Sequence, residues 1–315
     1  MNKIELIKTI NEEYKGKRLD AVLAKIFPEH SRTRLSSWIK KGVVFVDEEN
    51  TYRPKDKVKG GEEVVINTVL EDELSFEPEN IPIDIVYEDD SIIIINKNKD
   101  TVVHPAAGNP SGTLLNALLY HYPDLVNVSR AGIVHRLDKN TTGLMVVAKT
   151  TSAHTSLVSQ LQARDVKREY LALVDGVVKE AGRIETLVGR HPIHRTKMAV
   201  LSDSGKDAIT NYAIEKSFSK HTLLKVNLET GRTHQIRVHT AYLKHPIVGD
   251  PTYNKAKKTK EFNESLNITI NNFNRQALHA RKLGFLHPNT GLPVEFFAEL
   301  PSDFANLCKV IENNQ

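Results

Sequence analysis

The stretch "IVHRLDKNTTGLMVVAKT", residues 133–150, joins two apolar runs through a densely charged middle. That middle places His135, Arg136, Asp138 and Lys139 within five positions. Burying an arginine or an aspartate is costly unless the charge is paired or has a function. If the start of this stretch is a strand, alternation directs Arg136 and Asp138 to the same side. The pattern alone is compatible with an ion pair at a strand end or with a functional site.

The composition bounds the class of protein. The chain has 315 residues, 40% hydrophobic and 26% charged, which is typical of a soluble globular protein with room for two domains. It contains no apolar run of signal-peptide or membrane-span length, so we expect a cytoplasmic protein without a membrane partner. The single cysteine, Cys308, excludes an internal disulfide framework and a cysteine-based zinc site, and we expect an unreactive thiol in a terminal helix. A net charge of +4 permits a nucleic-acid partner without requiring one.

Residues 1–72 predict a compact module of two short helices followed by strands. Leu19, Val22, Leu23 and Ile26 recur at helical spacing, and a second helix begins near Ser31. Strands are expected within residues 43–54 and 62–67. Basic residues lie on or beside the second helix without a neighbouring acid, namely Arg32, Arg34, Lys40 and Lys41.

This module resembles the S4 RNA-binding domain. The matching residues are R-L-D at 18–20, S-R at 31–32 and G-x-V-x-V at 42–46. The domain usually continues with a tight Asn-Gly turn, whereas this chain has "DEENTY" at 47–52, for which we expect a longer turn. The resemblance implies that the four basic residues contact RNA.

The acidic, proline-containing stretch 70–82 predicts an inter-domain linker at residues 73–82. A second domain is expected at 83–300, with a C-terminal tail at 301–315. Its expected strands lie in "DSIIIINK", "GIVHRL", "LMVVAKT", "REYLALVDG", "KMAVLS", "TNYAIEKSF", "TLLKVNLET" and "PVEFFAEL", and its helices in "TLLNALLYHY", "SAHTSLVSQLQAR" and "HQIRVHTAYLKH". Many short strands and few helices predict an α+β fold with a large mixed, mainly antiparallel sheet.

Two other segments place polar residues where the chain leaves an apolar run. The segment 227–250 contains Arg232, His234, Gln235 and Arg237, and "NKDTVVHPAAG" at 98–108 follows the apolar "SIIIINK". Together with the opening stretch, these segments predict one polar cleft at the rim of the sheet.

The motifs in these segments resemble those of the RluA-type pseudouridine synthases. Residues 135–143 match H-R-L-D-x-x-T-S-G with Thr142 in place of serine, residues 230–237 match T-G-R-x-H-Q-I-R, and residues 93–105 match the first motif less closely. The resemblance covers residues 83–300 and, with the S4-like module, follows the ribosomal large-subunit synthase D subgroup. It implies conversion of uridine to pseudouridine in RNA, with ribosomal RNA as partner, no cofactor and no obligatory protein partner.

The resemblance also implies a role for each site residue. Asp138 is the catalytic carboxylate, Arg237 is its cation, and Tyr170 is the active-site tyrosine. Whether Asp138 attacks C1′ or removes the 2′ proton stays open. Base flipping and RNA binding are expected of Arg136, which is the wedge that replaces the flipped base, and of His135, Thr141, Arg232, His234 and Gln235.

Three other functions compete with this interpretation. A catalytically inactive RNA-binding ribosome-assembly factor would lack the catalytic residues, which are present. A metal-dependent nuclease or phosphatase would need several carboxylates, and His234 and His239 are five residues apart, on different faces of a helix or strand, so we expect no metal site. A glycoside hydrolase would need two opposed carboxylates, and no second acid belongs to these motifs.

Overall fold

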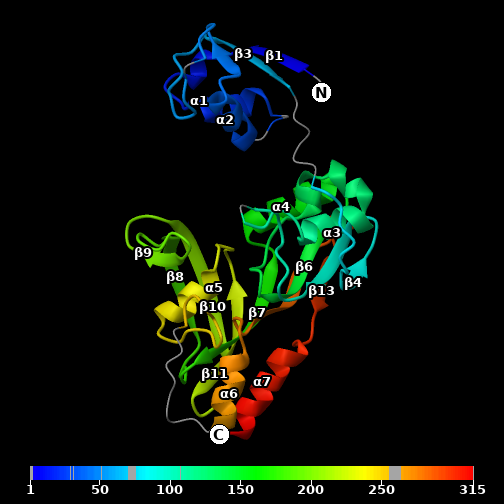
Figure 1. Ribbon diagram of the computed structural model, residues 1–315, viewed down its shortest axis with the longest axis vertical. Helices are drawn as coiled ribbons and strands as arrows, with labels where there is room; N and C mark the ends of the chain where they lie inside the picture. The colour runs from blue at the N-terminus through cyan, green and yellow to red at the C-terminus, as the bar shows by residue number, and fades with distance from the viewer. Residues whose placement is uncertain are drawn as a thin grey trace. The chain divides into compact units, whose positions relative to one another are not determined.

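The computed structural model describes residues 3–28, 30, 32–50, 52–69, 76–106, 108–254 and 264–314. The chain divides into two compact units, Met1–Ser75 (unit 1) and Phe76–Gln315 (unit 2), drawn in Figure 1. Each unit has its own hydrophobic core. Among the described residues, no helix has the length and apolar character needed to cross a membrane.

Unit 1 is a three-stranded antiparallel sheet with two helices. Its elements are β1 (Lys3–Thr9), η1 (Glu12–Tyr14), α1 (Leu19–Ile26), α2 (Arg32–Lys40), β2 (Val44–Val46) and β3 (Glu63–Val69), with the strand order β1-β3-β2. The periodic residues Leu19, Val22 and Leu23 are buried, as their spacing predicts. Strand β1 was not expected from the sequence.

The turn after β2 is shorter than expected. Asp47 and Glu48 both have positive φ, and Val46 and Glu49 exchange two backbone hydrogen bonds of 2.8 and 3.1 Å. This is the two-residue hairpin geometry that Asn-Gly usually supplies. The Asp47 carboxylate accepts a hydrogen bond from the Glu63 amide at 2.9 Å, which stabilises the turn without glycine. The longer turn expected from "DEENTY" was therefore wrong.

Unit 2 is built on a ten-stranded sheet with the order β4-β5-β6-β12-β7-β11-β10-β8-β9, and β13 pairs with β12. Of the strand pairs, β6 and β12 are parallel and the others are antiparallel, which confirms the predicted mixed, mainly antiparallel sheet. The strands are β4 (Ile85–Glu88), β5 (Ile92–Lys97), β6 (Thr142–Ala148), β7 (Lys167–Asp175), β8 (Gly182–Arg190), β9 (Met198–Leu201), β10 (Lys206–Ser217), β11 (His221–Leu228), β12 (Leu278–Leu286) and β13 (Pro293–Phe297). The helices are α3 (Leu114–His121), η2 (Pro123–Asn127), η3 (Ser129–Gly132), α4 (Thr151–Ala163), α5 (Gln235–Tyr242), α6 (Glu264–Asn272) and α7 (Ser302–Asn313).

The close contact between β6 and β12 explains the glycine of the opening motif. Gly143 has φ +113°, and a Cβ at this position would lie 2.2 Å from the Ala280 carbonyl oxygen. Gly143 and Ala280 are partners where the two strands pair in parallel. Because any side chain would separate the strands here, glycine fixes the start of β6 and with it the loop that precedes it.

Two of the predicted boundaries need correction. Residues 76–82 of the expected linker pack along α3, where the Asn116 side chain donates to the Glu77 carbonyl at 2.8 Å, and residues 73–75 lie outside the described residues. The expected tail at 301–315 contains the terminal helix expected around Cys308, α7, but this helix is part of the domain, because it buries Phe304, Leu307 and Ile311 in the core of unit 2. The helical spacing of these apolar residues is the reason that the segment folds onto the domain.

Candidate active site

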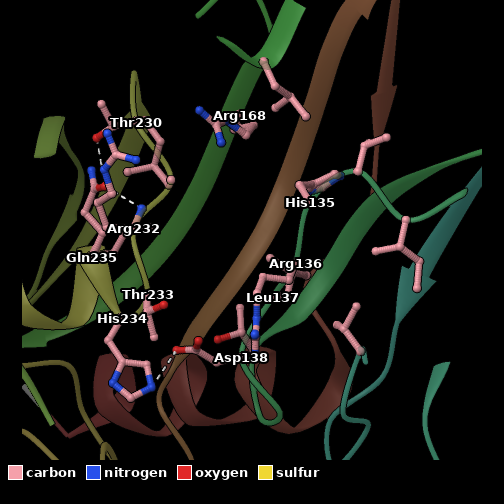
Figure 2. Close-up of a pocket in the computed structure, with 18 of the residues that line it drawn as sticks. His135, Arg136, Leu137, Asp138, Arg168, Thr230, Arg232, Thr233, His234 and Gln235 are labelled. Carbon is pink, nitrogen blue, oxygen red and sulfur yellow. Dashed lines mark hydrogen bonds and ion pairs between the residues drawn. The ribbon is translucent and has the colours of Figure 1, made fainter. Parts of the chain in front are cut away.

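A pocket of about 840 Å³ in unit 2 brings the three polar segments together. Residues from 103–106, 133–141 and 228–237 line it, with Arg168 and Tyr170 of β7 between them. Figure 2 shows the side chains of the second and third segments facing the same open space. Four of the lining arginines, Arg130, Arg136, Arg168 and Arg232, make no ion pair with a carboxylate among the described residues, so the pocket favours an anionic ligand.

The loop that carries Asp138 is irregular rather than the expected strand, because side chains hold its backbone groups in place of a strand ladder. The buried Lys97 donates to the carbonyls of Asn98, Thr101 and Lys139 at 2.8, 3.0 and 2.9 Å. Three acceptors match the three donors of an ammonium group. Burial lowers the pKa of Lys97 to about 7, and Asp138 opposes this shift. Lys97 therefore anchors the loop from the end of β5.

The other end of the loop is held by a short turn. The Thr141 amide donates to the Asp138 carbonyl at 3.0 Å, and the Thr141 hydroxyl accepts from Gln276 at 2.9 Å. Arg275 donates to the Asn140 carbonyl at 3.2 Å. Thr141 is buried, so its hydroxyl fixes the backbone beside Asp138. Thr141 also lines the pocket, and its expected RNA contact stays a prediction.

Asp138 is paired with Arg237, which in turn is held by a second carboxylate. Arg237 Nη1 donates to Asp138 Oδ2 at 2.9 Å, while its Nε and Nη2 donate to the two oxygens of Asp250 at 2.7 and 2.9 Å. Burial opposes the charge of Arg237, but the two carboxylates raise its pKa above the usual value. The guanidinium is therefore a fixed cation that orients the Asp138 carboxylate and places a positive charge beside it.

His234 approaches the same oxygen of Asp138 as Arg237 does. Its Nε2 is 3.8 Å from Asp138 Oδ2, a contact visible in Figure 2, and its Nδ1 is 2.8 Å from the Tyr253 hydroxyl. The residue precedes α5 with φ +57°, an uncommon conformation for a side chain of this size. Burial lowers the pKa of His234, although Asp138 opposes this shift. One oxygen of Asp138 thus faces both a permanent cation and a largely neutral imidazole.

Tyr170 projects from β7 into the same pocket. It is buried, and burial raises the pKa of its hydroxyl. No described residue forms a hydrogen bond with that hydroxyl, which leaves it available to a ligand. Arg168 lies two residues earlier on the same face of the strand.

The remaining predicted residues of this domain differ in their surroundings. Arg136 is exposed on the pocket rim and makes no hydrogen bond or ion pair with the described residues. Arg232 is half-buried, and its Nε donates to the Asp207 carbonyl at 2.8 Å. His135 accepts a hydrogen bond from the Val146 amide through Nε2 at 3.1 Å, and burial lowers its pKa to about 3. The His135 ring is therefore neutral at ordinary pH.

Gln235 has a structural task that the sequence did not reveal. Its carbonyl oxygen accepts from the Thr230 hydroxyl and the Arg232 amide, and its nitrogen donates to the Ile209 carbonyl and the Thr210 hydroxyl. These four bonds, 2.8 to 3.0 Å long, use the full capacity of the amide. Gln235 therefore closes the turn before α5 and has no group left for the RNA contact that we expected.

Three residues of the site were missed by sequence reasoning. Lys97 and Asp250 end apolar runs in the quoted motifs, and Arg168 shares a strand face with Tyr170. Spacing along β7 could have identified Arg168, whereas the contacts of Lys97 and Asp250 are with residues distant in sequence.

His239 bonds to Thr210 and Thr186 instead of joining His234. Within the described ranges, no three His, Cys, Asp or Glu residues are grouped to hold a metal ion.

In unit 1, the predicted RNA-contacting residues lie on or next to α2. Arg32 is largely exposed and donates to Asp20 at 3.0 Å. Burial of Asp20 opposes its ionisation, but hydrogen bonds from Arg18 and Arg32 lower its pKa. Arg34 lies over the Trp38 ring at 5.9 Å, and Lys40 and Lys41 are exposed.

Comparison with known proteins shows the family to which the chain belongs. Residues 91–242 match the family described as RNA pseudouridylate synthase. The chain is 51% identical over 310 residues to Ribosomal large subunit pseudouridine synthase D of Escherichia coli (strain K12), which covers 98% of this chain and 95% of that protein. The Haemophilus influenzae protein of the same name is 51% identical over 313 residues, 99% of this chain and 96% of its own. The solved structure of Human RNA Pseudouridylate Synthase Domain Containing 1 aligns with a TM-score of 0.53 and 26% identity over 70% of this chain and 84% of its own. The chain therefore belongs to the RNA pseudouridine synthase family, in the group of the ribosomal large subunit pseudouridine synthases D.

Proposed function

We propose that this pseudouridine synthase acts on uridines of large-subunit ribosomal RNA in the cytoplasm, with Asp138 as the catalytic carboxylate. The observation that carries the assignment is the 2.9 Å contact between Asp138 and the buried Arg237 inside a basic pocket. The names of the full-length relatives support the choice of ribosomal RNA.

The reaction explains why one fixed carboxylate is needed. The bond between N1 of uracil and C1′ of the ribose breaks, the base turns, and C5 bonds to the same carbon while a proton leaves C5 and N1 gains one. Nothing is added or lost, so no cofactor is required. Whether the carboxylate attacks C1′ or removes the 2′ proton, it must be ionised in a partly dry pocket, and Arg237 favours that state.

Tyr170 and Arg136 are proposed to handle the base. The Tyr170 ring offers a surface on which uracil stacks, and its protonated hydroxyl is free to bond to the ligand or to serve proton transfer at C5. Arg136 is unattached at the rim, as a residue that fills the space left by a flipped nucleotide must be. Its planar guanidinium suits stacking and contacts to phosphate.

We further propose that unit 1 is an S4-like RNA anchor. Arg32, Arg34, Lys40 and Lys41 are on or next to one helix, and a basic helix surface binds RNA phosphates independently of sequence. In this assignment unit 1 supplies affinity, and unit 2 supplies the chemistry.

The pKa of the second carboxylate in the pocket argues against glycoside hydrolysis. Glu229 lines the pocket, but a hydrogen bond from Asn211 and the charge of Arg183 lower its pKa. A hydrolase needs an acid with a raised pKa opposite the other carboxylate. The inactive assembly factor is disfavoured because Asp138, Tyr170 and Arg237 line one pocket together.

The proposal is tested by mapping pseudouridines in all RNA of a strain that lacks this gene. Specific sites in large-subunit ribosomal RNA should lose the modification and regain it with the wild-type gene, but not with Asp138→Asn. Loss of sites in transfer RNA alone would contradict the proposed substrate.

A further inference from the structure

Arg168 is a buried cation that the fold itself does not explain. The residue is 8% exposed, and among the described residues it has no carboxylate partner. Its Nε is buried without a hydrogen-bond partner, and Nη2 reaches the Glu229 carbonyl at 3.3 Å. Burial lowers the pKa of the guanidinium, and the nearby Arg232 lowers it further. A buried charge without a partner is costly, so Arg168 favours a ligand that brings a negative charge into the pocket.

The groups around Arg168 are donors as well. Figure 2 shows its side chain on β7 between His135 and the turn that carries Arg232. Arg232 also has no carboxylate partner among the described residues, and its Nε is used by the Asp207 carbonyl. Because Nε2 of the neutral His135 accepts from the Val146 amide, the ring proton is on Nδ1. Three donor groups thus surround one part of the pocket.

Gly231 leaves space for this guanidinium. A Cβ on Gly231 would lie 2.7 Å from Arg168 Nη1, and its backbone is not in the left-handed region that favours glycine. An alanine would therefore cause no backbone strain and would displace the end of one flexible side chain. The glycine of the T-G-R segment is explained by the position of Arg168.

We propose that Arg168, with Arg232 and His135, binds a phosphodiester that flanks the flipped uridine. This inference rests on the proposed function, which brings RNA into the pocket. Uracil and ribose are neutral, so the anion that a nucleotide delivers is its phosphate. Arg168 shares a strand face with Tyr170, which places this phosphate site next to the surface proposed for the base. A planar guanidinium is well suited to two phosphate oxygens.

The direct test removes the charge from the RNA instead of the protein. A neutral methylphosphonate replaces the phosphate on the 5′ or the 3′ side of the target uridine, and pseudouridine formation is measured under single turnover at saturating enzyme. At one of the two positions the wild-type rate should fall about tenfold or more, the value of one charge-assisted hydrogen bond. On unmodified RNA, the rate of the Arg168→Met variant should be lower than that of the wild type by a similar factor. On the RNA that carries the methylphosphonate at this position, the rate of the variant should fall no further.

Two controls accompany this measurement. Arg281→Gln removes an arginine that is paired with Glu215 at 2.9 Å and does not line the pocket, so it should respond to the methylphosphonate as the wild type does. A methylphosphonate placed distant from the target uridine should leave the wild-type rate unchanged.

Thermal stability separates this role from a structural one. Arg168→Met removes an unpaired buried charge and should leave the Tm unchanged or raise it. Gly231→Ala alone should leave the Tm unchanged and lower the rate of pseudouridine formation. Added to Arg168→Met, it should lower that rate no further. The inference would be overturned if the effects of Arg168→Met and of the methylphosphonate on the rate were additive. A lowered Tm of Arg168→Met would also overturn it. An inactive wild-type enzyme on unmodified RNA would instead overturn the proposed function.

Discussion

The position of the Arg237 guanidinium depends on Asp250. The side chain of Asp250 is fully buried and accepts two hydrogen bonds from Arg237 and two from the amides of Thr252 and Tyr253. Asp250→Asn would turn an amide N–H or a neutral oxygen toward the guanidinium. We expect a rate loss of about tenfold or more and a stability loss of about 2 kcal/mol, with RNA affinity retained.

The measurement is single-turnover pseudouridine formation together with RNA binding and Tm. Asp203→Asn, the same chemical change on an exposed turn, is the matched control. An unchanged rate in a folded Asp250→Asn protein would show that Asp250 does not position Arg237.

Arg136 tests base flipping separately from chemistry. Extruding a uridine from a folded stem costs a few kcal/mol, and much less from a flexible strand. Arg136→Ala should therefore slow single-turnover modification severely on structured RNA and mildly on a flexible RNA of the same sequence. Because Arg136 makes no hydrogen bond or ion pair with the described residues, Tm should not change.

Lys139→Ala, which removes an exposed charge three positions away, is the control for net charge. A loss of equal size on both RNAs would make Arg136 a binding or orienting residue.

The residue-scale contacts show what the sequence could and could not predict. Asp138 and Arg237 are 99 positions apart, and their pairing was expected from the motifs. The contacts that hold this pair in place were not expected, because the partners of Arg237 and Gln235 depend on which polar groups the fold brings near them. The full internal bonding of Gln235 and the missing partner of Arg168 are properties of packing, which a motif does not contain.

At the scale of elements, the reactivity of the Cys308 thiol reports on the packing of helix α7. Cys308 packs against the core of unit 2, and burial raises its pKa to about 11. A pKa above the usual value means less thiolate at any pH below it, so modification by a thiol reagent near pH 8 should be about a hundredfold slower than for a free thiol. The rate should rise as the pH approaches 11.

The chain has one cysteine, so the entire signal belongs to this site. The same reagent should titrate one thiol promptly in denaturant. Rapid modification of the native protein would show that α7 detaches readily from the core.

Two strands that sequence patterns missed, β8 and β12, have polar residues in place of an apolar run. β12 reads "LHARKLGFL" and β8 reads "GRIETLVGR", and both place charged residues within a strand. Their pairing with neighbouring strands decides their structure, because β propensity depends strongly on such contacts. The segment "GIVHRL", expected as a strand, forms the isolated bridge between Ile133 and Val147, and the loop that follows it is held at the carbonyls of Lys139 and Asn140 by Lys97 and Arg275.

At the scale of the whole molecule, we propose that the two units divide affinity and chemistry. Removing residues 1–75 should weaken RNA binding and reduce the dependence on salt, because each lost phosphate contact lowers the slope of log K against log salt by roughly 0.7 to 0.9. The rate on saturating RNA should remain close to that of the full chain. The full-length Lys40→Ala/Lys41→Ala variant should show the same change to a smaller extent. Equal binding and target selection without unit 1 would contradict its role as an anchor.

The proposed activity depends on one carboxylate in the pocket, that of Asp138. The most direct measurement is the single-turnover rate of pseudouridine formation by Asp138→Asn, with Glu229→Gln, the other carboxylate of the pocket, as its control. We expect Asp138→Asn to bind RNA normally and to form pseudouridine at less than about a hundredth of the wild-type rate, a loss of ~3 kcal/mol or more in transition-state stabilisation. Glu229→Gln should remain active. Turnover by Asp138→Asn above that level, or an equal loss in Glu229→Gln, would contradict the assignment of Asp138.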